Sequence, residues 1–380
     1  MEVDSAVGLY IHIPFCQARC TYCDFNTADG LESYHAKYVQ ALAQEMAASI
    51  PAELRTVYIG GGTPTVLPLL DLARILEMVF RDRVLAPGTE ITIEANPGTV
   101  DGPMLSGLLT LGVNRLSLGV QSFVDSELRL LGRIHTAAEA VDAYCAARRA
   151  GFRNINLDLI FGLPGQVLVS WQLSLARALE LAPEHLSLYA LSVEPGTPLA
   201  ASIARGELPN PDPDLAADMY ELAAEACAGA GYLHYEISNW AQQSDFCCQH
   251  NLMYWRNEAY VGVGAGAHSW TEGQRWANVA PPLLYTDLVL QGDSAVVSRA
   301  IIPVELEMGE TMMMGLRLLD EGVGFRRFHQ RFGTDLRERY AVEIDELQRL
   351  GLVQVSDDRI RLSPRGRLLG NQVFCRFLPG

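Results

Sequence analysis

Three cysteines near the start of the chain are the residues best suited to chemistry. Cys16, Cys20 and Cys23 have the spacing C-x3-C-x2-C and follow the apolar run 8–14, so we expect them on a loop that leaves a buried strand. Three thiolates can bind three corners of a cubane iron–sulfur cluster and leave the fourth iron without a protein ligand. Such an open iron is a site for chemistry.

A structural zinc site is the alternative for these thiols. Zinc in such sites takes four ligands, usually supplied by two knuckles of Cys or His. No second knuckle is present, because Cys247 and Cys248 are adjacent and His12 lies in an apolar run where a core histidine is expected. The triplet therefore favours an iron–sulfur cluster.

A glycine-rich turn, Gly-Gly-Gly-Thr-Pro-Thr at 60–65, follows the predicted strand 55–59. Glycines let a backbone approach a ligand closely and leave its N–H and C=O groups accessible. Alone this turn is weak evidence. Placed after a second strand, in a chain that carries the cysteine triplet, it indicates ligand contact.

Polar residues also end otherwise apolar strands. Glu94, Gln121 and Asp158 stand at equivalent strand ends, and Arg133 lies twelve residues beyond Gln121. Any one of them could be a loop cap, but three at equivalent ends predict one shared cavity. Arg133 would offer that cavity a planar fork for a carboxylate.

A second constellation comes late in the chain: Cys248-Gln-His250-Asn-Leu-Met-Tyr-Trp255. A histidine beside two aromatic residues is consistent with ordinary core packing. It also suits haem, because imidazole is a good axial ligand, aromatic faces fit a flat macrocycle and a thiolate is a second potential ligand.

Strands that alternate with helices must position these residues. Such alternation predicts right-handed crossovers and an α/β fold, a partial six-stranded parallel (β/α) barrel with its reactive residues on the loops after the strands. The predicted strands are 7–13, 55–59, 90–95, 115–120, 154–160 and 185–191, and the predicted helices are 33–49, 69–80, 101–111, 137–150, 170–181 and 215–230.

The C-terminal part has a different pattern, that of a small α+β domain similar to a winged helix. Its predicted helices are 311–318, 325–332 and 335–350, and a hairpin joins strands 351–355 and 359–362. Residues 301–380 hold 12 Lys+Arg and 12 Asp+Glu, so no basic surplus supports DNA binding. We divide the chain into a barrel (1–235), a haem-motif segment that ends in a linker at 281–299 (236–300), and the C-terminal domain (301–380).

Composition narrows the class of protein. The formal net charge is −16, which disfavours nucleic acid and anionic lipid at long range and leaves at most peripheral membrane contact. No run approaches eighteen apolar residues, and residues 1–5 lack the start of a signal peptide. Three of the eight cysteines crowd into eight positions, unlike a disulfide scaffold. We expect a cytoplasmic protein.

The triplet and the glycine turn resemble those of the radical S-adenosylmethionine (SAM) enzymes, whose motif is C-x3-C-x2-C on the first loop of a partial barrel. The resemblance implies a [4Fe–4S] cluster on Cys16, Cys20 and Cys23. It also implies that SAM chelates the open iron and that a reductant delivers an electron. SAM is then cleaved to a 5′-deoxyadenosyl radical.

Residues from about Leu9 to Ala190 match the HemN-like group of this family, the oxygen-independent coproporphyrinogen dehydrogenases. That resemblance assigns Gly61, Gly62 and Thr63 to the methionine amino group of SAM, and Glu94 and Arg133 to its carboxylate end. Other residues would surround the rest of SAM: Gln121 and Asp158 at the ribose, Tyr10 beside the sulfonium, Ile160 and Ala190 along the adenine, and Tyr22 near it.

H-N-x-x-Y-W at 250–255 resembles the signature of the haem chaperone branch of that group, HemW. The resemblance implies haem on His250, with Cys248 as the alternative ligand, and delivery to haem-acceptor proteins such as respiratory enzymes. Two departures separate the chain from the dehydrogenase, which has a fourth cysteine where Phe25 stands and an extension ahead of the cluster. Both favour haem delivery over porphyrinogen oxidation.

Three other functions stay open at this point. One is coproporphyrinogen III dehydrogenase itself, which converts propionates to vinyl groups. A second is a methyltransferase on the same scaffold, and a third is a haem chaperone that never cleaves SAM.

Overall fold

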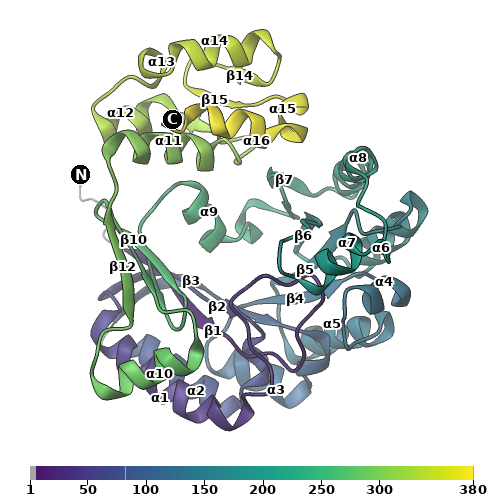
Figure 1. Ribbon diagram of the computed structural model, residues 1–380, viewed down its shortest axis with the longest axis vertical. Helices are drawn as coiled ribbons and strands as arrows, with labels where there is room; N and C mark the ends of the chain where they lie inside the picture. Colours follow the sequence, from purple (N-terminus) through teal and green to yellow (C-terminus); the bar gives the residue numbers. More distant parts are fainter. Residues whose placement is uncertain (1–5, 82, 380) are drawn as a thin grey trace.

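A sheet of parallel strands forms the centre of the molecule in the computed structural model, which describes residues 6–81 and 83–379 (Figure 1). Residues 1–5, on which the expectation about a signal peptide rests, lie outside this description. Six strands pair in parallel in chain order. They are β1 (Val7–Ile13), β2 (Glu53–Gly61), β3 (Val84–Ala95), β4 (Arg115–Gln121), β5 (Ile155–Phe161) and β6 (His185–Ala190).

Helices connect these strands. All six predicted strands are confirmed within a few residues, except that β3 begins earlier than expected, at Val84. The connecting helices are α1 (His35–Ser49), α2 (Leu69–Phe80), α3 (Gly102–Thr110), α4 (Asp125–Leu130), α5 (Ala137–Ala150) and α6 (Leu168–Leu181), with short 3-10 helices η1 (Glu32–Tyr34), η2 (Pro64–Val66) and η3 (Pro97–Thr99).

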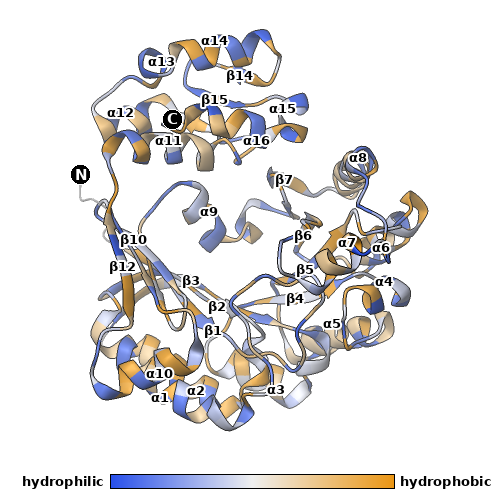
Figure 2. Ribbon diagram, in the orientation of Figure 1, coloured by the Kyte–Doolittle hydropathy of each residue, from blue (hydrophilic) through white to orange (hydrophobic). Residues whose placement is uncertain are grey.

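Apolar spacing explains how these helices pack. In α2, Leu72, Ile75, Leu76 and Val79 recur at the helical period and are buried. Burial of each such side chain contributes about 1.5–3 kcal/mol. The helices that cover the sheet carry hydrophobic and hydrophilic residues along their length (Figure 2), as expected for elements with one face on a core.

The sheet continues beyond the six predicted strands on both sides. Within the described residues it has 12 strands, in the order β12-β11-β10-β9-β1-β2-β3-β4-β5-β6-β8-β7, and β9 is parallel to β1. The added strands come from the segment after the barrel: β7 (Leu233–Glu236), β8 (Asn239–Ala241), β9 (Tyr260–Val263), β10 (His268–Thr271), β11 (Gln274–Asn278) and β12 (Val296–Ile301).

The predicted linker at 281–299 is wrong. It contains a helix, α10, and most of the edge strand β12, which pairs with β11. Its two consecutive prolines, Pro281 and Pro282, lie at the start of this helix, and the buried helix residues Tyr285 and Val289 pack on the main core. The remaining elements of this part of the chain are α7 (Pro198–Ala204), α8 (Pro213–Gly229), η4 (Ser244–Phe246), α9 (Gln249–Trp255) and α10 (Pro282–Gln291).

The C-terminal domain has its own hydrophobic core and a three-stranded sheet in the order β13-β15-β14. The single helix predicted over 335–350 is two helices, because Tyr340 leaves helical geometry at φ −119°. The domain consists of α11 (Val304–Gly315), β13 (Val323–Gly324), α12 (Phe325–Phe332), α13 (Leu336–Arg339), α14 (Ala341–Arg349), β14 (Val353–Val355), β15 (Arg359–Leu362), α15 (Pro364–Leu368), α16 (Gly370–Phe374) and η5 (Cys375–Phe377). No helix in 6–81 or 83–379 is both long and apolar enough to traverse a bilayer.

One carboxylate ties the first helix to the added strands. Glu45 on α1 accepts hydrogen bonds from the Gly264 N–H (2.8 Å), the Asn278 amide (2.6 Å) and the Tyr285 hydroxyl (2.5 Å). All three donors lie in the segment 236–300. That segment is therefore joined to the barrel by polar contacts as well as by sheet pairing.

Replacement of Glu45 by alanine should lower the free energy of unfolding by about 2–4 kcal/mol, because three donors lose their acceptor. Urea denaturation of the purified chain measures this. Asp287→Ala, which breaks only the exposed pair with Lys37, should cost less than about 1 kcal/mol. Equal losses in the two variants would contradict the role given to Glu45.

Candidate functional site

The cysteine loop follows β1 and is held by backbone hydrogen bonds. Cys16 N–H donates to Ala28 C=O (2.9 Å), and Thr21 N–H donates to Leu131 C=O (3.1 Å). Cys16, Cys20 and Cys23 are unpaired and half-buried. The loop is thus anchored at both ends, with its three thiols accessible.

Each thiol has a polar neighbour. The Thr63 hydroxyl donates to the Cys16 sulfur (3.7 Å), the Arg133 guanidinium donates to the Cys20 sulfur (3.3 Å), and the Cys23 sulfur lies 3.8 Å from the Thr27 hydroxyl. No three His, Cys, Asp or Glu side chains of the described chain surround a single metal ion. A cubane cluster does not need several side chains around one ion, because each thiolate binds a different iron.

The glycine turn packs directly against the start of the cysteine loop. A Cβ on Gly62 would lie 2.6 Å from the Phe15 carbonyl oxygen, and one on Gly61, where φ is +116°, would lie 2.5 Å from the His12 ring. Only glycine fits at either position. Close backbone packing therefore accounts for both residues, and their contact with SAM stays a prediction.

Arg133 lies beside the cysteine loop. Its guanidinium donates to the Gly119 carbonyl (2.7 Å) and to the Asn96 side chain as well as to Cys20, while its Nε has no partner. A small hollow adjoins it, lined by Gln17, Ala18, Cys20, Thr63, Asn96, Thr99, Gly132, Arg133 and Ile134. The predicted carboxylate fork thus lies next to the predicted cluster.

Glu94, at the end of β3, lies within reach of the same turn. Its carboxylate accepts hydrogen bonds from the Tyr58 hydroxyl (2.7 Å) and the Gly61 N–H (3.1 Å). Burial raises the pKa of Glu94 to about 7, and the Tyr58 hydrogen bond opposes that shift. Glu94 therefore titrates near neutral pH.

Gln121 ends β4, and Asp158 lies within β5. Burial raises the pKa of Asp158, against hydrogen bonds from Asn156 (2.8 Å) and Ser117 (3.0 Å). Gln121 has φ +69°, a left-handed conformation that costs energy in a residue other than glycine and is often found at functional sites. Glu94 and Gln121 thus lie at the carboxyl ends of β3 and β4, whereas the predicted strand-end position of Asp158 is wrong, because β5 continues to Phe161. Their sharing of one cavity stays a prediction.

The residues expected around the rest of SAM divide into three groups. Tyr10 donates to or accepts from His12 (2.9 Å) and its ring stacks on Tyr58. Tyr22 packs in one apolar cluster with Ile160. Ala190 is exposed at the end of β6. Tyr22 and Ile160 thus share one apolar cluster, and their contact with adenine stays a prediction.

His250 is buried in the protein interior at the start of α9. Its Nδ1 is 2.8 Å from the Thr56 hydroxyl, its Nε2 is 3.1 Å from the Tyr254 hydroxyl, and its ring stacks on Tyr58. Burial lowers its pKa to about 3. Both ring nitrogens already have partners, so binding a haem iron requires the imidazole to release one of them.

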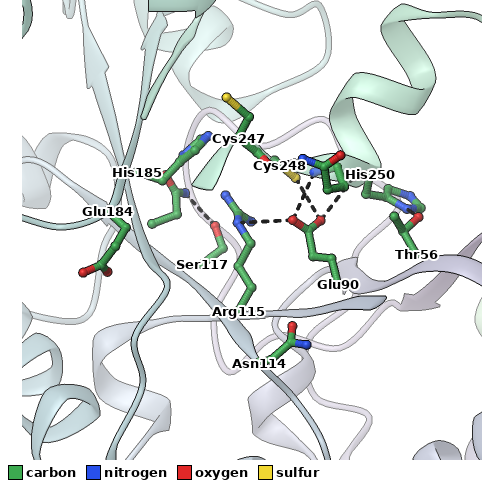
Figure 3. A network of polar contacts seen from close by, with 12 residues as sticks. Thr56, Glu90, Asn114, Arg115, Ser117, Glu184, His185, Cys247, Cys248 and His250 are labelled. Atoms are coloured by element: carbon green, nitrogen blue, oxygen red, sulfur yellow. Dashed lines mark hydrogen bonds and ion pairs between the residues drawn. The ribbon is translucent and has the colours of Figure 1, made fainter. Parts of the chain in front are cut away.

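Two residues that hold α9 in place were not predicted from the sequence. Glu90 accepts hydrogen bonds from the N–H groups of Gln249 (3.0 Å) and His250 (3.2 Å), and the Cys248 thiol donates to it at 3.5 Å (Figure 3). Arg115, also buried, approaches Glu90 at 4.0 Å. Burial raises the pKa of Cys248 to about 12. The signal that could have indicated Glu90 and Arg115 is a charged residue in each of two otherwise apolar strands.

Comparisons with known proteins agree with this geometry. The profile of the Radical SAM superfamily matches residues 10–173, and that of the HemN C-terminal domain matches residues 303–369. A protein named Heme chaperone HemW in Bacillus subtilis is 39% identical over 376 residues, 97% of this chain and 98% of that one. The chain belongs to the HemW family of radical SAM proteins. That membership confirms the predicted resemblance.

More distant relatives extend the comparison. A mouse protein named Radical S-adenosyl methionine domain-containing protein 1, mitochondrial, is 34% identical, covering 100% of this chain and 88% of its own length. The solved structure of Escherichia coli coproporphyrinogen III oxidase (HemN) has a TM-score of 0.84 with 24% identity, covering 98% of this chain and 90% of that one. This structural match confirms the predicted fold class.

Family membership implies a [4Fe–4S] cluster and SAM. The residues present fit both groups. Three free thiols share one anchored loop, and the unpartnered Nε of Arg133 beside Cys20 leaves a donor for an incoming ligand.

Glu94→Gln should change how stability depends on pH. Because the folded pKa of Glu94 is raised to about 7, its protonation stabilises the fold fully below pH 4.5, and this contribution is lost as the pH rises to 7. The loss is at most about 3 kcal/mol. Urea denaturation between pH 4.5 and 8 should show this decline in the wild type and a flatter profile in Glu94→Gln. Glu225→Gln, at an exposed site, is the control, and a decline unchanged in Glu94→Gln would contradict the assignment.

Proposed function

We propose that this chain is a haem chaperone that binds a [4Fe–4S] cluster, SAM and haem and delivers the haem to acceptor proteins. The observation that carries the proposal is the match to proteins named Heme chaperone HemW along almost the whole length of both chains. The side-chain arrangement supports it, since the H-N-x-x-Y-W helix packs on the strands that carry the candidate SAM residues.

In this proposal Cys16, Cys20 and Cys23 hold the cluster. When bound, the cluster and SAM would supply one-electron chemistry at the open iron. Protein groups would bind and orient SAM: Gly61, Gly62 and Thr63 at the amino group, Glu94 and Arg133 at the carboxylate end, Gln121 and Asp158 at the ribose, and Tyr10, Tyr22, Ile160 and Ala190 along the sulfonium and adenine.

Haem ligation is assigned to His250, with Cys248 as the alternative. The low pKa of His250 keeps its imidazole neutral at pH 7, as an iron ligand must be. The raised pKa of Cys248 disfavours a thiolate ligand. His250 is therefore the better candidate of the two.

The state of the cysteines indicates the cellular compartment. All eight cysteines are free, which suits a reducing compartment such as the cytoplasm. The partners would be a reductant for the cluster and haem-acceptor proteins such as respiratory enzymes.

Coproporphyrinogen III dehydrogenase is the second candidate, since the HemN structure shares the fold. Phe25 argues against it, because this side chain, 65% exposed, stands where the dehydrogenase resemblance requires a fourth cysteine. The test is to express this chain in a strain that lacks the dehydrogenase. Growth of that strain without added haem would contradict the chaperone-only assignment.

Haem binding is tested on anaerobically purified, cluster-loaded protein. The wild type should bind haem and pass it to an apo-protein acceptor, whereas His250→Ala should change the haem absorbance and weaken binding about tenfold or more, because an iron ligand is lost. The control is His329→Ala in the C-terminal domain, an exposed histidine. Unchanged absorbance and stoichiometry in His250→Ala would remove His250 from the role.

A further inference from the structure

Asn96 joins two side chains that donate hydrogen bonds to the cysteine loop. It follows β3 directly, and its side-chain NH₂ group donates to the Thr63 hydroxyl oxygen (2.8 Å). Its side-chain carbonyl oxygen accepts a hydrogen bond from the Arg133 guanidinium. Asn96 therefore lies one hydrogen bond away from each of two side chains that contact predicted cluster ligands.

Those two side chains contact different thiols. The Thr63 hydroxyl donates to the Cys16 sulfur (3.7 Å), and the Arg133 guanidinium donates to the Cys20 sulfur (3.3 Å). The donors come from separate segments, the turn after β2 and the loop after α4. Two of the three predicted cluster ligands thus receive hydrogen bonds from donors that Asn96 connects.

Arg133 fixes the direction of the hydrogen bonds in this network. A guanidinium carries donors only, so Asn96 must present its carbonyl oxygen to Arg133 and its NH₂ group to Thr63. The Thr63 oxygen then accepts from Asn96, and its single proton is free for the Cys16 sulfur. Both donors are therefore oriented toward cysteine sulfurs, which accept hydrogen bonds as thiolates, the form that binds iron.

Close packing holds Asn96 in this orientation. Its backbone N–H donates to the Thr99 hydroxyl (3.2 Å), which in turn donates to the Asn96 backbone carbonyl (2.8 Å). On the other side, a Cβ on Gly119 would lie 2.8 Å from the Asn96 side-chain oxygen, and the Gly119 carbonyl accepts from Arg133 (2.7 Å). The amide is thus fixed by its own backbone and by the strand beside it.

Hydrogen bonds to the sulfurs of an iron–sulfur cluster help to set its reduction potential. Uptake of one electron from a reductant converts [4Fe–4S]2+ to [4Fe–4S]1+ and increases the negative charge on the cluster and its thiolates. A donor aimed at a thiolate stabilises this more negative state more than the oxidised one. The potential is therefore higher when such donors are in place.

We propose that Asn96 is a positioning residue that aims Thr63 and Arg133 at the cluster thiolates and thereby raises the reduction potential of the cluster. It binds no iron itself and acts through the two donors. The assignment rests on the proposed function, of which the cluster is a part. It adds the residue that governs how readily the cluster accepts its electron.

Asn96→Asp tests this role, because it reverses the polarity of the network at nearly constant shape. A carboxylate cannot donate, so the Thr63 proton should turn from Cys16 to the new acceptor. The potential should fall by about 60 mV, which is a tenfold change in the ratio of reduced to oxidised cluster at a fixed potential. A redox titration of the anaerobically reconstituted chain without SAM, followed by electron paramagnetic resonance of the reduced cluster, measures the potential. Iron content shows that the cluster is present.

Thr63→Val is the second variant and removes one donor without a change in charge. Its potential should fall by about 30 mV, which is about a threefold change in the same ratio. SAM is absent from the titration, so a lost contact between Thr63 and SAM does not affect the result. The two substitutions lie on different segments, so a variant that fails to assemble the cluster leaves the other one decisive.

Asn210→Asp is the matched control. Asn210 is exposed in the loop between α7 and α8, and its replacement changes the net charge by the same amount as Asn96→Asp. Its potential should equal that of the wild type. Wild-type potentials in the Asn96 and Thr63 variants that retain the cluster would overturn the role of Asn96 and leave the chaperone proposal standing. A wild type that assembles no [4Fe–4S] cluster would overturn both.

Discussion

The buried carboxylate of Glu90 is the interaction on which the arrangement of the site depends. It lies on β3 and accepts the first N–H groups of α9, with the fully buried Arg115 beside it. The N-terminus of a helix has N–H groups without partners inside the helix, and an acidic group there is favourable. Removal of one member of such a buried pair leaves an uncompensated charge, which costs about 3–5 kcal/mol. Glu90 therefore places the haem motif over the barrel.

This placement brings two candidate sites to one side chain. The ring of Tyr58 stacks on His250, while its hydroxyl donates to Glu94 at the candidate SAM site. Haem motif and SAM residues therefore share a neighbour, although they are far apart in the sequence. Arg317 of the C-terminal domain packs on Trp255, so the haem motif also contacts that domain.

Sequence patterns predicted what depends on local spacing. The cysteine triplet after β1, Glu94 and Gln121 at the ends of their strands and the helical period of α2 are local signals, and the structure places them accordingly. Asp158 is the exception, because β5 continues three residues beyond it. Pairings between distant segments left no comparable signal. The edge strand β12 is exposed along most of its length and is defined by its pairing with β11, and Tyr58, Glu90 and Arg115 resembled ordinary strand residues. Their importance comes from the tertiary contacts that position α9. The spacing of residues along one sequence does not reveal such contacts.

Tyr58 contacts both the haem motif and the candidate SAM residues, so we expect it to support the binding of both ligands. Titration of Tyr58→Leu with haem and with SAM tests it most directly, because this change removes both the ring under His250 and the hydroxyl on Glu94. We expect both affinities to fall, each by about fivefold or more. A variant that stays folded and binds haem as tightly as the wild type while losing SAM would contradict it.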